Sequence, residues 1–113
     1  AQSIETHISV IAPGGTGQRH GHMNSALFYI LSGKGYDIHD GKRIDYEAGD
    51  VIIVENGCVH QHFNASDEED LVSLVMKAKP LFLFMHMLFQ KVAEYPPKEP
   101  VPGWEHWEPP TDL

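Results

Sequence analysis

Two short stretches rich in histidine could carry chemistry in this chain. His20 and His22 stand two positions apart, and His60 and His62 repeat this spacing forty positions later. In an extended strand, residues two apart project from the same face, so each pair would aim two imidazoles at one point. Imidazole is the commonest metal-binding side chain at neutral pH. If the two strands lie side by side or face each other, the pairs predict a metal held inside a small barrel.

Strands and turns around both pairs indicate what positions them. Alternating or continuous apolar runs separated by turn residues predict strands at residues 6–12, 26–32, 36–39, 42–46, 51–54 and 71–79. Asp40 and Gly41 both tolerate positive φ, so they predict a tight hairpin between two of these strands. Short strands about ten residues apart, each followed by a turn, are typical of an all-β sandwich or barrel.

The pattern changes beyond Pro80. Four apolar residues at helical spacing predict a short C-terminal helix, although 81–85 could instead continue as a buried strand: Met85, Leu88, Phe89 and Val92. From residue 95 onward, six of the eight prolines and both tryptophans fall within nineteen residues, which is incompatible with regular structure. We therefore expect a barrel domain with its helix over residues 1–94, and an arm over residues 95–113 packed on the barrel or on a partner subunit.

Composition and charge argue against several classes of protein. Acidic residues outnumber basic residues by 16 to 8, and the resulting net charge of −8 disfavours binding to nucleic acid or anionic lipid. The hydrophobic content of 42% predicts a folded domain, and the longest apolar run, 80–89, is too short to span a bilayer. The single cysteine, Cys58, fits a reducing compartment. We expect one cytoplasmic domain, with the 80–89 run and the arm supplying the surface of a homodimer.

The spacing of glycines and histidines resembles the two motifs of the cupin superfamily. The first motif, G-x5-H-x-H-x3,4-E-x6-G, matches at Gly14, His20, His22 and Gly33. The second motif, G-x5-P-x-G-x2-H-x3-N, matches at Gly49, Gly57, His60 and Asn64. The resemblance covers nearly half of the chain. It implies a double-stranded β-helix, the cupin jelly-roll barrel, with a metal bound by His20, His22 and His60.

Two positions depart from these motifs. Glu55 replaces the proline of the second motif, and we expect this replacement to affect only the geometry of a turn. Ala26 replaces the glutamate that serves as the fourth metal ligand of the first motif. The remaining ligand set is similar to that of three-histidine cupins such as the gentisate and salicylate 1,2-dioxygenases. Three neutral imidazoles leave the charge of a divalent ion uncompensated and three facial positions of an octahedral ion open.

The resemblance therefore implies a mononuclear iron(II) dioxygenase. A hydroxybenzoate-like, catechol-like or enolisable substrate would chelate the metal beside dioxygen, and a C–C bond would be cleaved. Two alternatives stay open. One is an isomerase or lyase that uses zinc, manganese or nickel as a Lewis acid, and the other is a non-enzymatic cupin that binds or senses a small molecule.

Residues near the ligands complete the candidate site. His62 shares the face of His60 and is a candidate substrate contact, general base or extra ligand, with a supporting hydrogen-bonding role as the alternative. Gln18 shares the face of His20 and is a candidate for orienting substrate or oxygen. Three residues in phase on one strand would line the substrate pocket, with ordinary core packing as the alternative: Ala26, Phe28 and Ile30. We expect Cys58 to be a small buried thiol, and His39, which belongs to neither motif, to be an ordinary surface or core residue.

Overall fold

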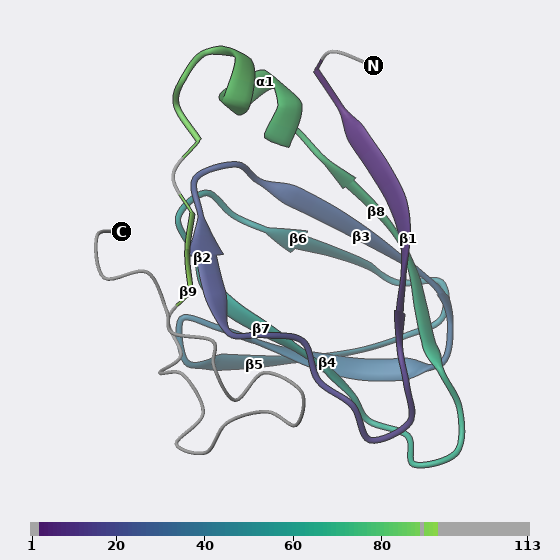
Figure 1. Cartoon of the computed structure of the whole chain (residues 1–113). Helices are drawn as coiled ribbons and strands as arrows, with labels where there is room; N and C mark the ends of the chain where they lie inside the picture. Colours follow the sequence, from purple (N-terminus) through teal and green to yellow (C-terminus); the bar gives the residue numbers. More distant parts are fainter. Residues whose placement is uncertain (1–2, 89, 93–113) are drawn as a thin grey trace, which may run out of the picture.

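Two antiparallel β-sheets lie face to face in the computed structural model, which describes residues 3–88 and 90–92 (Figure 1). One sheet has four strands in the order β1-β8-β3-β6, and the other has five in the order β5-β4-β7-β2-β9. This arrangement confirms the all-β prediction. The elements are β1 (Glu5–Ile11), β2 (His20–His22), β3 (Ala26–Ser32), β4 (Lys34–His39), β5 (Lys42–Glu47), β6 (Val51–Val54), β7 (Val59–Asn64), β8 (Leu71–Lys77), α1 (Lys79–Phe84) and β9 (Gln90–Val92).

The core lies between the two sheets, and strand alternation selects which side chains enter it. On β6, Ile52 and Val54 are buried, whereas Val51 and Ile53 are exposed. Because successive side chains of a strand point to opposite faces, one run of four apolar residues supplies both an inner and an outer surface. The inner residues form two clusters, one made of Ile30, Tyr46, Ile52 and Leu71 and the other of Ala26, Val54 and Cys58.

The predicted hairpin joins β4 to β5. Asp40 has a φ of 46° and Gly41 a φ of 84°, so both residues occupy the left-handed region that a tight two-residue hairpin turn requires. This turn sets the register of β4 against β5, in which Asp37 lies opposite Ile44. It therefore also decides which residues of β4 face the interior.

A buried asparagine ties the end of β7 to two other parts of the chain. The side-chain nitrogen of Asn64 donates to the carbonyl oxygens of Ile11, Ala12 and Glu69 at 2.9, 3.1 and 2.8 Å. Its side-chain oxygen accepts a hydrogen bond from the backbone N–H of Ser66 at 2.8 Å. Since Asn64 is only 7% exposed, these bonds satisfy polar groups that water cannot reach.

The predicted short C-terminal helix is present, but it lies before the residues whose spacing predicted it. The helix α1 covers only Lys79–Phe84, with Pro80 in its first turn, and the chain leaves helical geometry at His86, whose φ is 55°. Residues Gln90–Val92 are not helical but form β9, which pairs with the edge of β2. Backbone pairing to an open sheet edge thus prevails over the helical spacing of side chains.

Among the described residues, no helix is long and apolar enough to cross a membrane. The proposed arm, 95–113, lies outside the described residues.

The hydrogen bonds of Asn64 predict a strong effect of a nearly isosteric substitution. Asn64→Asp should lower the free energy of unfolding by at least about 2 kcal/mol, because a buried carboxylate cannot donate to three carbonyl oxygens. Chemical denaturation at pH 7 measures this change. The matched control is Asn56→Asp in an exposed turn, which should change stability by less than about 0.5 kcal/mol. Equal effects of the two substitutions would contradict the assigned role of Asn64.

Candidate metal centre

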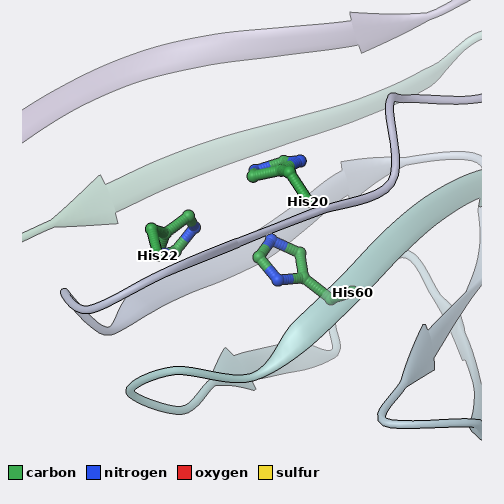
Figure 2. A group of neighbouring side chains, drawn as sticks. All are labelled: His20, His22 and His60. Atoms are coloured by element: carbon green, nitrogen blue, oxygen red, sulfur yellow. The ribbon is translucent and has the colours of Figure 1, made fainter. Parts of the chain in front are cut away.

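Three histidine side chains converge inside the sandwich. His20 and His22 come from β2 and His60 comes from the neighbouring strand β7, in a register that places His20 directly opposite His60. Figure 2 shows the three imidazoles close to one another, two from β2 and one from β7. Their potential ligand atoms all lie within 4.8 Å of one another. The structure therefore brings together the three residues that the cupin motifs indicate as ligands.

Each of the three rings is held by a backbone carbonyl through its Nδ1 atom. The distances are 2.8 Å from His20 to Gln18, 2.7 Å from His22 to Asn24 and 3.0 Å from His60 to Cys58. A carbonyl oxygen only accepts hydrogen bonds, so each Nδ1 must carry a proton, and the neutral form of each ring has its free lone pair on Nε2. A histidine that donates its other N–H to a carbonyl is the usual supporting contact of a metal ligand. The donor set thus fits a divalent ion.

Burial keeps His22 and His60 in the form that binds metal. Desolvation lowers the pKa of His60 to about 4, despite the opposing effect of its hydrogen bond to the Cys58 carbonyl. Desolvation likewise lowers the pKa of His22. Both rings are therefore neutral at pH 7, and no proton has to be removed before a metal binds.

A buried carboxylate organises the polar groups beside the three histidines. Asp37 on β4 lies opposite His62 on β7 and is only 1% exposed. Its Oδ1 atom accepts hydrogen bonds from His62 Nδ1 and from the Tyr46 hydroxyl, both at 2.8 Å. Its Oδ2 atom lies 3.1 Å from His39 Nε2. One carboxylate thus receives three side-chain donors.

The hydrogen bonds of Asp37 determine the protonation of its neighbours. Burial by itself would raise the pKa of Asp37, but the hydrogen bonds from His62, Tyr46 and His39 outweigh it and the pKa is lowered. Burial, together with the adjacent carboxylate, raises the pKa of Tyr46, which therefore remains a donor. Since an ionised Asp37 only accepts, the Nδ1 atom of His62 must carry its proton. In the neutral form of His62, the Nε2 atom is therefore the one that can accept a proton or hydrogen bond.

His62 lies next to the metal-binding group without belonging to it. In the described part of the chain, the group that could share one ion consists of His20, His22 and His60. The ring of His62 lies 5.2 Å from the ring of His60 and 4.5 Å from that of Phe28, measured between centroids. This position is suitable for a group that contacts a metal-bound substrate.

The other residues singled out by sequence occupy different environments. Ala26 packs with the buried thiol of Cys58, which confirms the prediction for that cysteine, and Ile30 is 2% exposed within the larger core cluster. Phe28 contacts both clusters. Gln18 is exposed, and its backbone carbonyl rather than its side chain holds His20. Whether these side chains contact a substrate stays a prediction.

Sequence reasoning missed Asp37, Tyr46 and His39. Asp37 and His39 stand two positions apart, the same spacing as in the histidine pairs, so the sequence could have predicted that their side chains share a face of the strand. What the sequence did not indicate was which strand lies beside β4. His39 lies opposite His60 because β4 pairs with β7, and the sequence between these strands does not reveal that pairing. His39 is thus part of the polar network rather than an ordinary surface or core residue.

Comparison with known proteins agrees with the fold. The sequence matches the cupin domain over residues 7–77, which is more than half of the chain. The chain belongs to the cupin family. A 1-hydroxy-2-naphthoate 1,2-dioxygenase from Nocardioides sp. (strain KP7) is 26% identical over 89 residues, covering 79% of this cupin and 23% of that protein. A gentisate 1,2-dioxygenase from Aquipseudomonas alcaligenes is 33% identical over 67 residues, covering 58% of this cupin and 19% of that protein.

A solved structure with the same architecture is the salicylate 1,2-dioxygenase from Pseudaminobacter salicylatoxidans. It matches this cupin with a TM-score of 0.77 at 19% identity, covering 81% of this chain and 26% of that one. This similarity confirms the predicted cupin fold. The chain spans about a quarter or less of the length of these three relatives.

The geometry predicts which substitutions weaken metal binding. His20→Ala and His60→Ala should each weaken binding of Fe²⁺ or Zn²⁺ at least about 100-fold, because losing a ligand costs more than losing a supporting contact. Competition titrations against a chelator measure the affinity. His7→Ala is the control, since the His7 side chain on β1 is 42% exposed and lies outside the cluster. Unchanged affinity in either cluster variant would contradict the assigned ligands.

Proposed function

We propose that this cupin is a mononuclear iron(II) dioxygenase that cleaves a C–C bond of an aromatic or enolisable substrate. The observation that carries the proposal is the cluster of three histidines with Ala26 at the position of the motif's carboxylate ligand. The names of its relatives support it, because the naphthoate, gentisate and salicylate enzymes are all dioxygenases. The three compounds in those names share one feature, which is two neighbouring groups that carry oxygen atoms.

The ligand set explains why such a substrate fits. Three neutral imidazoles contribute no negative charge and occupy one face of an octahedral ion. A chelating hydroxybenzoate, catechol or enolate supplies the missing charge. When bound, iron(II) provides the redox link between substrate and dioxygen that the side chains of the site lack. Cleavage with both oxygen atoms retained in the product balances without an added reductant.

The residues beside the ligands would prepare the substrate. His62 is the candidate base, because its Nε2 atom can accept the proton that a substrate hydroxyl loses on chelation. Asp37 holds this imidazole in the required orientation and tautomer. Ala26 would leave space where a carboxylate would otherwise stand, and Phe28 and Ile30 are the candidates for apolar surface beside it. Gln18 is a further candidate for orienting the substrate.

The same three-histidine set also supports a second function. Three imidazoles with an open position are a known catalytic arrangement for zinc, so a zinc, manganese or nickel isomerase or lyase is the alternative activity. A cupin that binds a small molecule on its metal without turnover is the non-enzymatic form of the same chemistry. A cytoplasmic location and a homodimeric state complete the proposal.

Oxygen uptake by the iron-loaded protein tests the dioxygenase function. Protein purified without oxygen should contain about one iron per chain. It should consume oxygen only when a hydroxybenzoate, catechol or β-diketone is added. His60→Ala should abolish this uptake, whereas His7→Ala should retain it. Zinc, manganese or nickel in the purified protein, together with no uptake after iron loading, would favour the Lewis-acid or binding function instead.

The positioning role of Asp37 gives a separate prediction. Asp37→Asn should lower kcat about 10- to 100-fold while the iron content stays unchanged, because the substituted residue no longer holds His62 in one tautomer. Asp45→Asn, in the exposed ion pair with Arg43 on β5, is the matched control and should leave kcat unchanged. If Asp37 acts through His62, the double variant Asp37→Asn/His62→Gln should be no slower than His62→Gln. If the two substitutions instead lowered kcat by factors that multiply in the double variant, Asp37 would not act through His62.

A further inference from the structure

The segment between β8 and β9 carries apolar side chains that the core does not use. Eight of the ten residues from 79 to 88 are apolar, yet none of these ten residues is buried. Neither core cluster of the described residues includes any of them. Five of the apolar side chains are well exposed: Phe84 (81%), Leu83 (61%), Met87 (51%), Met85 (46%) and Leu81 (39%). Exposed apolar side chains gathered in one place mark a site of interaction.

This segment, residues 79–88, begins and ends beside the candidate metal centre. It follows Lys77, which pairs with Ala26, the position at which the cupin motif has its carboxylate ligand. It leads into Gln90, which pairs with His22, one of the three candidate ligands. Because β8 belongs to one sheet and β9 to the other, the chain crosses the end of the sandwich at which these residues lie. Figure 1 shows α1 beyond this end, above the connection from β2 to β3. We call residues 79–88 the crossing segment.

Hydrogen bonds within the crossing segment give it a defined shape. The backbone N–H of His86 donates to the carbonyl oxygen of Leu83 at 3.1 Å. The backbone N–H of Met87 donates to the carbonyl oxygen of Phe82 at 2.8 Å. The left-handed conformation of His86, with a φ of 55°, is typical of the end of a helix. A folded turn therefore presents the apolar side chains, and contact with a ligand would require little ordering of the backbone.

An aromatic ligand on the metal would need apolar surface around its ring. The groups next to His60 are mostly polar, since His39, His62 and the carboxylate of Asp37 lie there. Phe28 contributes one apolar ring, whose centroid lies 4.5 Å from that of His62. Sites for small molecules usually combine a few polar groups with predominantly apolar walls. The crossing segment offers such a wall at the end of the sandwich where His22 lies.

We propose that the crossing segment is an apolar wall of the substrate site and selects metal-chelating aromatic acids that carry an apolar extension, such as a second fused ring. The size of the segment favours a small ligand, because a specific protein interface takes about 20–30 residues from each partner. The inference rests on the proposed function, from which it takes the chelating substrate. It gives residues 80–89 a role that differs from the dimer surface predicted from the sequence.

Ligand binding to the full zinc-loaded chain tests the proposal without turnover. Salicylate and 3-hydroxy-2-naphthoate present the same chelating groups and differ by one fused ring. In isothermal titration calorimetry, the wild-type protein should bind the two-ring ligand at least about 10-fold more tightly, because its second ring is removed from water. Phe84→Ser/Met87→Ser or Leu81→Ser/Met85→Ser should reduce this preference at least about fivefold, while the affinity for salicylate changes less than about twofold.

Substitutions of comparably exposed residues elsewhere provide the control. Ile8→Ser/Val10→Ser on β1 removes two apolar side chains that are 54% and 58% exposed. This variant should keep the wild-type preference for the two-ring ligand. Circular dichroism confirms that all three variants are folded.

Several results would overturn the proposal. If both segment variants kept the wild-type preference, or the control variant lost it equally, the crossing segment would not be the wall that selects the ligand. If neither ligand bound, the site would not take chelating aromatic acids. If the segment variants changed only the sedimenting mass, the segment would be a protein interface instead. Because zinc does not supply the redox chemistry of iron, a failure of the dioxygenase function would appear in oxygen uptake and not in these measurements.

Discussion

The pairing of β2 with β7 is the constraint on which the candidate metal centre depends. It places His20 opposite His60, and the alternation of β2 adds His22 on the same face. Shifting this register by one residue would turn every side chain of the strand to the other face, so the ligands would be lost together. Asn64 anchors one end of β7, and β9 covers the far edge of β2. The centre is therefore a property of the whole sheet.

A second constraint is the charge of Asp37 inside the sandwich. An ionised carboxylate without partners would be strongly destabilising in the core, but His62, Tyr46 and His39 surround this one with donors. The interior thus retains a negative charge even though Ala26 occupies the position of the motif's ligand carboxylate. The roles are divided. The three clustered histidines are the candidate metal ligands, while the carboxylate orients the groups beside them.

Local patterns predicted most of the architecture. The apolar alternation around Ile52 and the Asp40-Gly41 turn are local signals, so the strands and the hairpin could be predicted from the sequence. The cluster of three candidate ligands could be predicted because their spacing matches a family motif. The network of Asp37 depends on β4 pairing with β7, and β9 depends on an open edge of β2, so neither is encoded by neighbouring residues. For this reason the helical spacing near Met85 predicted a short helix correctly but not its position.

The carbonyl contacts of His20, His22 and His60 have a consequence for metal selectivity. Because the rings are oriented before any ion arrives, binding requires little rearrangement, and the apoprotein and the loaded protein should have nearly the same structure. A rigid triad of nitrogen donors ranks divalent ions by their intrinsic affinity, which favours copper and zinc over iron. The three nitrogen donors by themselves would therefore not select iron over these ions. The supply of ions during synthesis, rather than the shape of the site, would decide which chemistry this barrel performs.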